Sequence, residues 1–486
     1  MSSIPEPSPI RTARKPTGLA LWMTRVLEEC DRARVALDAD PVHDLRVALR
    51  RCRSLADGIM VMDPDPAWKQ MKKAGKRLFG RLGELRDAQV MEEWIRRLGS
   101  PDDPVTSGML QFLGGREAQL KQDAAEALEQ FDVRQWRRWS ASMPRRAARI
   151  RPGSALFKHL ALERWTEARK LHQGALRNRS RLAWHRLRIG IKRFRYIVEN
   201  FLPEEHTAWS AGLKELQDLL GEVHDLDVLQ TTLLQANALA EPDSRLLWLE
   251  RIARERTWRI DKYRKTMLGD ESLWQTWRAG LPYGREIESA ALGRVKLWAS
   301  RLDPDFKHSL RVARVALQLY DGLARTALSN PGRKDQRSIL QVAALLHDVG
   351  RSKAEKGHHK ASHKLVTRLA PPMGWSAEKM RTAGIVARYH RGSLPVARHS
   401  ELAGLSVTQR QEVAYLAAIL RLANAFDSGS EGKIQRVKIS EHNGVIWVSA
   451  QGYSARDRRA ERIAGARHLL EVVTRRPVMV KALRAP

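Results

Sequence analysis

The sequence contains the same basic helix pattern twice. The first copy is HDLRVALRRCR, which begins at His43, and the second is HRLRIGIKRFR, which begins at His185. In both, basic residues follow the histidine at offsets of 3, 7 and 10, which lie on one face of a helix. The opposite face is apolar, so each segment predicts an amphipathic helix with a cationic face. These faces carry His43, Arg46, Arg50 and Arg53, and His185, Arg188, Lys192 and Arg195.

The uniform positive charge of these helix faces indicates that they bind an anion. A cationic face can simply be solvated, but ordinary solvated faces mix the two signs of charge. Aligning like charges does not help folding unless an extended anion lies against them. The formal net charge of +31 over 486 residues also favours a polyanionic partner, either nucleic acid, an anionic membrane surface or a phosphate polymer.

Length and cysteine content limit the class of protein. The chain is long enough for two to four domains. Its two cysteines, Cys30 and Cys52, occupy apolar positions of predicted helices and exclude a disulfide framework or a thiolate zinc site. Residues 1–16 lack the apolar stretch of a signal peptide and predict a disordered tail. The sequence contains no run of about 18 apolar residues, which a membrane-spanning helix would need. We therefore expect a cytoplasmic protein without membrane contact.

The first part of the chain is helical and duplicated. Apolar residues recur with helical spacing from Leu19 to about Trp277. Besides the basic segments, LGELRDAQV at 82–90 resembles LGEVHDLDVL at 220–229. We therefore expect two helical copies that pack on each other. Their expected ranges are about 17–150 and 155–284.

A second basic helix is expected in the first copy only. Residues 68–82 combine an apolar stripe with six cations, whereas the corresponding segment of the second copy keeps only Lys214. The first copy should therefore carry the denser positive field. Among these six cations we select Lys69, Lys73 and Lys76 as candidate anion-binding residues.

The chain changes character after a linker at about 282–288. Helical periodicity continues with more histidines, which predicts a second helical domain at 287–430. Near the end, two β-rich runs flank Asn443-Gly444, which predicts a hairpin. With a following helix and a short strand, residues 431–486 should form a small α/β subdomain. The expected fold class is thus mainly α with this small addition.

The composition of the basic faces favours one class of polyanion. Arginine offers forked donors to phosphate oxygens, and lysine offers a compact charge. Base recognition needs amide side chains or aromatic platforms, and the two stripes have neither. Inorganic polyphosphate therefore fits better than nucleic acid, which stays an alternative.

The paired segments, each followed by an LGE..D..V segment, resemble the CHAD domain over residues 17–281. This resemblance implies an all-helical, pseudo-twofold domain that binds inorganic polyphosphate through its basic helix faces. The residues it points to are His43, Arg46, Arg50, Arg51, Arg53, His185, Arg188, Lys192, Arg193 and Arg195.

The second part contains residues with the order and type of a metal site. His308, the adjacent His347-Asp348 and the distant Asp427 follow the ligand order of the HD metal-dependent phosphohydrolases. Imidazole and carboxylate can hold a divalent ion with positions left for water and phosphate. A degenerate module without metal is the alternative. Because imidazole predominates, Mn²⁺, Fe²⁺ or Zn²⁺ is favoured over Mg²⁺, which prefers oxygen ligands.

Further histidines follow the His347-Asp348 pair. His358, His359, His363 and His390 could complete a second metal site, contact phosphate, or be ordinary surface or supporting residues. We select His359 as a further metal ligand and assign catalytic roles to His347, Asp348 and His390.

Residues from about 287 onward resemble the C-terminal region of the exopolyphosphatase and guanosine pentaphosphatase family. The similar stretches are LLHDVGRSKAEKGHHKASHKL, IVARYHRGSLP and AAILRLANAFDSG. In that family the module accompanies an ATPase-like catalytic domain, which this sequence lacks, and is often not itself catalytic. Our hypothesis is a polyphosphate-binding protein whose HD-like domain hydrolyses polyphosphate or a related phosphate compound. The alternatives are a non-catalytic protein of polyphosphate granules and a nucleic-acid or nucleotide phosphohydrolase with a basic clamp; the oligomeric state stays open.

Overall fold

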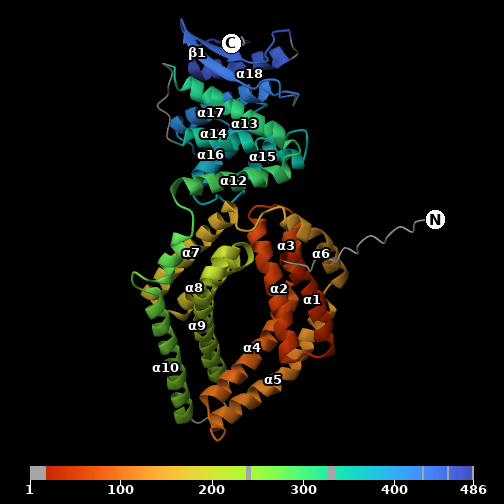
Figure 1. Ribbon diagram of the computed structural model, residues 1–486, viewed down its shortest axis with the longest axis vertical. Coiled ribbons are helices and arrows are strands. Elements are labelled where there is room, and N and C mark those ends of the chain that lie inside the picture. Colours follow the sequence, from red (N-terminus) through yellow and green to blue (C-terminus); the bar gives the residue numbers. More distant parts are fainter. Residues whose placement is uncertain (1–17, 237–241, 327–334, 430–431, 457–458, 484–486) are drawn as a thin grey trace, which may run out of the picture. The chain divides into compact units, whose positions relative to one another are not determined.

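A computed structural model describes residues 18–236, 242–326, 335–429, 432–456 and 459–483. The predicted tail at 1–16 lies outside these ranges. The described chain is mainly helical, with one small sheet near its C-terminal end, which confirms the predicted fold class (Figure 1). It forms two compact units, one made of the chain up to Val61 and of Asp65–Pro282, the other of Met62–Pro64 and Tyr283–Pro486.

Eleven helices of the described chain belong to the first unit, and their starts follow local sequence signals. Proline occupies a first-turn position at Pro66, Pro104 and Pro203, where its missing N–H costs nothing. The helices are α1 Gly18–Val35, α2 Ala39–Met60, α3 Pro66–Ala74, α4 Lys76–Leu98, α5 Pro104–Glu129, α6 Val133–Ala147, α7 Ala155–Asn178, α8 Arg181–Phe201, α9 Pro203–Gln235, α10 Pro242–Met267 and α11 Leu273–Ala279.

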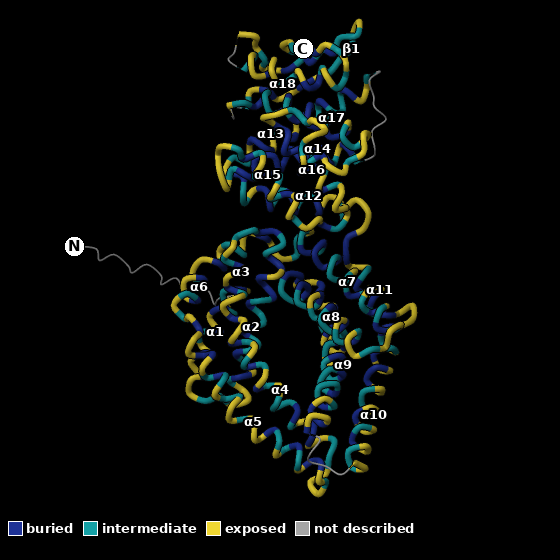
Figure 2. The backbone as a smooth tube through the Cα atoms, turned by 180° about the vertical axis from the view of Figure 1, so that it is seen from behind, coloured by how far each residue is buried: buried dark blue, intermediate teal, exposed yellow. Residues whose placement is uncertain are grey.

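The helices of the first unit pack in the same way twice. The pairs α1–α2, α2–α4 and α4–α5 are matched by α7–α8, α8–α9 and α9–α10. The two copies join where α2 packs on α8 and α4 on α9. Figures 1 and 2 show α2 and α4 on one side and α8 and α9 on the other. The duplication predicted from sequence is therefore present in the fold.

The predicted apolar faces of α2 and α8 form part of the core of the first unit. The predicted apolar faces are buried in both helices, because they supply the contacts with neighbouring helices. The buried residues of these faces are Leu45, Leu49, Cys52 and Leu55 in α2 and Leu187, Ile191, Phe194 and Ile197 in α8.

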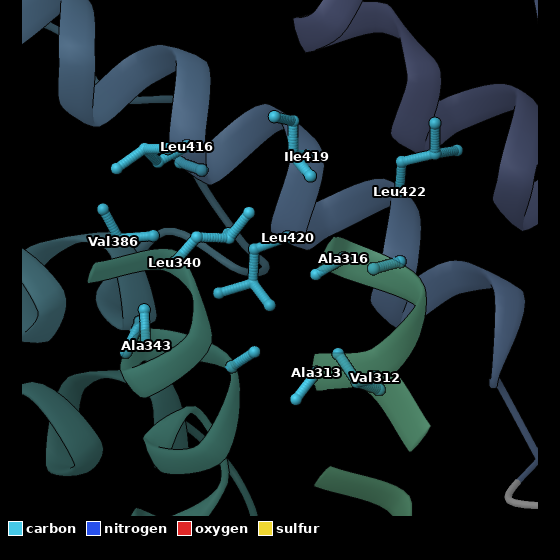
Figure 3. Packing of buried hydrophobic residues seen from close by; sticks show 14 of the residues in the cluster. Val312, Ala313, Ala316, Leu340, Ala343, Val386, Leu416, Ile419, Leu420 and Leu422 are labelled. Atoms are coloured by element: carbon cyan, nitrogen blue, oxygen red, sulfur yellow. The ribbon is translucent and has the colours of Figure 1, made fainter. Parts of the chain in front are cut away.

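The second unit is built around α13, α14, α16 and α17. Figure 3 shows how their apolar side chains meet, for example Val312 of α13, Leu340 of α14 and Leu420 of α17. All three are fully buried. The α-helices of this unit are α12 Gly284–Leu302, α13 Phe306–Leu323, α14 Gln336–Leu346, α15 His358–Thr367, α16 Ala377–Arg388, α17 Val407–Phe426 and α18 Arg459–Thr474.

The small sheet has the strand order β1-β2-β3. Strands β1 Val437–His442 and β2 Val445–Ala450 form an antiparallel hairpin, and β3 Val478–Ala482 pairs parallel to β2 after α18. Asn443 and Gly444 have φ angles of 51° and 75°, the left-handed conformation that a tight hairpin turn requires. The hairpin predicted at Asn443-Gly444 is confirmed.

None of the described helices is both long and apolar enough to cross a membrane.

Candidate functional site

The cationic faces of α2 and α8 form one electrostatic surface, which we call the α2/α8 surface. It contains Arg46 and Arg50 from α2 and Arg188 and Lys192 from α8. Burial, followed by the charges of Arg188 and Arg50, lowers the pKa of Lys192 to about 7. The two stripes are thus close enough to oppose each other's charge. A bound anion would relieve this repulsion.

Guanidinium groups of this surface lack partners. Arg46 Nη1, Arg50 Nε and Arg188 Nε are each buried, and none has a hydrogen-bond partner among the described residues. A buried charged donor without an acceptor is costly in free energy. Because these donors come from both copies, they are suited to an anion that extends across the two helices.

A glycine of the repeated LGE segment makes room for one of these arginines. A Cβ atom built on Gly83 of α4 would lie 2.5 Å from Arg46 Nη1. On its other side, the Arg46 guanidinium lies 5.1 Å from the ring centroid of Phe79, and that of Arg53 lies 4.9 Å from the same ring. These contacts fix the direction of both side chains.

Two equivalent carboxylates also belong to the α2/α8 surface. Asp87 of α4 and Asp225 of α9 occupy the same position in the two LGE..D segments. Burial raises the pKa of Asp225 to about 6, against the opposing effect of Arg188. Burial likewise raises the pKa of Asp87, although Arg46 and Arg188 oppose it. These acids counter part of the positive charge when no anion is bound.

The leading histidines differ between the copies. His43 is exposed, whereas His185 Nδ1 lies 3.4 Å from Nδ1 of His224 on α9. Burial and then Arg188 lower the pKa of both imidazoles of the second copy, that of His224 to about 4. These two rings are therefore neutral in the free protein near pH 7.

Other residues selected from the sequence have different surroundings. Arg51 of α2 donates to Glu199 of α8 at 2.5 Å and so joins the two helices, whereas Arg195 lies 3.8 Å from the same carboxylate within α8. Arg193 is exposed and pairs with Glu167 of α7 at 3.0 Å. The basic segment expected as one helix over residues 68–82 is divided at Gly75 between α3 and α4, and its selected lysines, Lys69, Lys73 and Lys76, are exposed on α3 and at the start of α4.

A second site lies where several helices of the second unit end. His308 is in the first turn of α13, His347 and Asp348 follow α14, His358 begins α15, and His390 follows α16. All five side chains are buried. The structure brings them together as two overlapping groups that could hold a metal ion, His308–His347–Asp348 and Asp348–His358–His390. We call these five residues the His/Asp cluster.

Backbone contacts orient three imidazoles toward Asp348. In each, Nδ1 lies within hydrogen-bond distance of a carbonyl three residues earlier: His347 of Ala344 at 2.7 Å, His358 of Glu355 at 2.8 Å, and His390 of Ala387 at 2.8 Å. With Nδ1 as the donor, each Nε2 keeps its lone pair. The Nε2 atoms lie 3.5, 3.2 and 3.6 Å from Asp348 Oδ1, in the same residue order.

This arrangement fits a divalent ion. His347 Nε2 is buried and has no hydrogen-bond partner among the described residues, and Nε2 of His358 lies only 3.3 Å from Nε2 of His390. Burial, more than any neighbouring charge, lowers the pKa of His347 and His390 and thus favours their neutral forms. Lone pairs that converge on a carboxylate repel it unless a proton, as between His358 and Asp348, or a metal ion lies between them. Imidazole with carboxylate suits Mn²⁺, Fe²⁺ or Zn²⁺.

Asp348 carries the negative charge of the cluster. Burial disfavours its ionisation, but positive charge on His347, His358 and His390 when these rings are protonated, together with a hydrogen bond from His358, outweighs this effect and holds its pKa far below the ordinary value. It is the one residue common to both groups and would help to hold an ion in either of them.

Two predicted ligands, Asp427 and His359, lie outside these two groups. Asp427, at the end of α17, lies 2.7 Å from His308 Nδ1 and accepts from Arg311 Nε at 2.9 Å, and it belongs to neither group. His359 also belongs to neither group and instead lies beneath Gly392. The neighbouring His358, which was not selected from the sequence, belongs to the group with Asp348 and His390. The sequence did not separate these two adjacent histidines; in the structure His358, the first residue of α15, has its Nε2 3.2 Å from Asp348 Oδ1.

A cleft of about 810 Å³ opens on the His/Asp cluster. His308, Asp348, His358, His390 and Asp427 line one part of it. Four arginines also line it: Arg351, Arg391, Arg421 and Arg462. Positive charge beside a metal-type cluster is suited to a phosphorylated ligand.

His363 lies in a separate cleft of about 500 Å³, together with Arg381 and Glu401. Burial lowers the pKa of its imidazole. This histidine is therefore not part of the His/Asp cluster.

Comparison with known families agrees with both parts of the chain. Residues 23–234 match the CHAD domain, and residues 294–448 match domain III of the Ppx/GppA phosphatases. No curated protein matches the chain. The first match contains the α2/α8 surface and the second contains the whole His/Asp cluster. The chain thus combines a CHAD domain with a Ppx/GppA phosphatase domain III.

Proposed function

We propose that this protein binds inorganic polyphosphate on its α2/α8 surface and hydrolyses polyphosphate or a related phosphate compound at the His/Asp cluster. The observation that carries the first part is the set of three buried, unpartnered guanidinium nitrogens, contributed by both copies of the repeat. A linear chain of phosphates offers acceptors at regular intervals without bases. The match to the CHAD domain supports the same class of ligand.

The second part of the proposal depends on the His/Asp cluster. A divalent ion held there supplies a coordinated water of lowered pKa and neutralises charge on a phosphoryl group. His308, His347, His358 and His390 would hold it with Asp348, and the carbonyls of Ala344, Glu355 and Ala387 keep three of the rings in place. Arg351, 3.6 Å from Asp348, is positioned to orient a phosphoryl oxygen at this end of the cleft.

The binding experiment replaces Arg46, Arg50, Arg188 and Lys192 by glutamate in the full chain. We expect polyphosphate binding to be lost while the helical circular dichroism is kept, because the apolar faces of α2 and α8 are untouched. Wild-type affinity should fall steeply with added salt, as counterion release requires. Unchanged affinity in the folded variant contradicts the proposal, and equal or tighter binding of single-stranded RNA at matched charge favours the nucleic-acid alternative.

The hydrolysis experiment measures phosphate release from polyphosphate with Mn²⁺, Fe²⁺, Zn²⁺ or Mg²⁺. We expect Asp348→Ala to lose both metal and phosphate release but to keep polyphosphate binding, because Asp348 lies in a different unit from the α2/α8 surface. Wild-type protein that carries no metal and releases no phosphate would leave a non-catalytic, polyphosphate-binding function, such as attachment to polyphosphate granules.

A further inference from the structure

The four arginines of the cleft divide into two kinds. Arg351 contacts Asp348 and donates to Glu355 at 3.1 Å. Arg421 donates to the carbonyls of Tyr389 at 3.1 Å and Gly392 at 3.0 Å. Arg391 and Arg462 are exposed, and neither forms a hydrogen bond or ion pair with the described residues. Arg351 and Arg421 are thus held by contacts within the protein, with Arg351 beside Asp348, whereas the guanidinium groups of Arg391 and Arg462 make no such contact with the described residues.

The position of Arg391 is set by its loop. Arg421 ties down the backbone on both sides of Arg391 through the carbonyls of Tyr389 and Gly392. Gly392 has a φ of +76°, and a Cβ atom there would lie 3.2 Å from His359 Nε2, so the loop passes close over this ring. The same loop carries His390 of the His/Asp cluster, which links the position of Arg391 to the cluster itself.

Arg462 reaches the cleft from a different element. It lies on α18, and the cleft is also lined by Gly465 and Ala466, three and four residues later on the same helix face. A Cβ atom on Gly465 would meet nothing within 4 Å. This face of α18 therefore combines one cation with two small residues, which leaves room for a ligand beside the guanidinium.

The cleft lacks features that recognise a nucleobase. Apart from its imidazoles, the described residues that line it include no aromatic ring, and the carbonyl oxygen of its single amide, Asn424, lies 3.0 Å from His308 Nε2. Stacking platforms and free amides are the usual means of holding a base. The available contacts are instead the cluster and two free guanidinium groups, all of which suit phosphoryl oxygens.

We propose that Arg391 and Arg462 bind the phosphoryl group adjacent to the one held at the His/Asp cluster, so that the cleft selects condensed phosphates over phosphomonoesters. This inference deepens the proposed function and rests on it for the location of the first phosphoryl group. A ligand with two linked phosphoryl groups contacts the cluster and both arginines, whereas a single group contacts the cluster alone. Selectivity should therefore depend on these two arginines.

The test uses binding of compounds that cannot be hydrolysed at the linking atom. The full chain, with Arg46, Arg50, Arg188 and Lys192 already replaced by glutamate to remove the α2/α8 surface, is loaded with Mn²⁺. Methylenediphosphonate and methylphosphonate are then titrated calorimetrically. We expect Arg391→Ala and Arg462→Ala each to weaken diphosphonate binding about tenfold, the loss of one charge-assisted contact, and to change methylphosphonate binding less than about twofold. Arg436→Ala, an exposed arginine that does not line the cleft, is the charge-matched control.

The possible results distinguish a failure of this inference from a failure of the proposed hydrolysis. Diphosphonate selectivity that depends on the two arginines supports the inference even in a protein that releases no phosphate. A protein that hydrolyses polyphosphate but whose diphosphonate affinity is unchanged by both substitutions refutes the inference and keeps the proposed function. Equal losses for both phosphonates, or no diphosphonate binding by the parent protein, also overturn it.

Discussion

Arg46 of α2 lies against α4 at the point where Gly83 has no side chain. A Cβ atom on Gly83 would lie 2.5 Å from Arg46 Nη1, whereas one on Gly221, the equivalent glycine of the second copy, would meet nothing within 4 Å. The two positions therefore differ in what a methyl group would do. The difference provides a matched pair of substitutions.

We expect Gly83→Ala to weaken polyphosphate binding about three- to tenfold, because the Arg46 guanidinium must leave its position beside Phe79. Gly221→Ala should leave affinity unchanged. Both should keep or raise stability, by up to about 1 kcal/mol, since alanine is favoured over glycine inside a helix. Fluorescence-anisotropy titration and urea unfolding measure the two effects; equal affinities of the two variants would contradict the role of Gly83.

Polyphosphate affinity should fall as pH rises between about 6 and 8. Lys192, with a pKa of about 7, loses its positive charge in this range, and Asp225, with a pKa of about 6, gains a negative one. A bound polyanion raises both pKa values, so binding takes up protons. Calorimetry in buffers of different ionisation enthalpy measures that uptake directly.

Two substitutions test whether Lys192 and Asp225 cause this pH dependence. Lys192→Arg keeps its charge throughout the range and should flatten the upper part of the profile, whereas Asp225→Asn should flatten the lower part. If both variants show the wild-type profile, other groups are responsible.

The sequence predicted the basic surface well because its signal is local and repeated. Offsets of 3, 7 and 10 place His43 and the three cations that follow it on one helix face, and the duplicate at His185 repeats that arrangement. Asp87 and Asp225 were missed as parts of this surface. Their shared position in LGELRD and LGEVHD was visible, but only the packing of α4 and α9 brings them toward Arg188.

For the His/Asp cluster, the spacing of residues in the sequence does not predict which side chains contact Asp348. The order of His308 and His347-Asp348 in the sequence predicted residues that the structure brings together, but the order did not distinguish His358, which lies in the same cluster, from His359, which does not. Asp427 lies 2.7 Å from His308 and pairs with Arg311, one turn after His308, and its predicted role as a ligand stays a prediction. Which of its possible partners a carboxylate contacts depends on tertiary packing, and the spacing of a motif does not determine that packing.

Glu199 should matter for stability rather than for affinity. It accepts from Arg51 of α2 and lies near Arg195 of its own helix, so it helps to hold α2 on α8. Glu199→Gln leaves two partly buried arginines with a weaker partner and should destabilise the first unit by about 1–3 kcal/mol. Glu167→Gln, which removes the exposed pair with Arg193, should cost less than about 1 kcal/mol. Urea unfolding followed by circular dichroism tests this difference, and similar midpoints for the two variants would refute it.

The adjacent histidines at the start of α15 give the sharpest test of the His/Asp cluster. His358 Nε2 lies 3.2 Å from Asp348 Oδ1, whereas His359 belongs to neither metal-type group. We expect His358→Ala to lose at least half of the bound metal, measured by plasma mass spectrometry on protein purified without chelator. His359→Ala should keep the wild-type metal content, although it alters the packing beneath Gly392. Because Asp348 is shared by both groups, Asp348→Ala should lose all metal. The reverse result, with metal lost from His359→Ala but kept by His358→Ala, would restore the ligand expected from sequence and reject the arrangement described for the cluster.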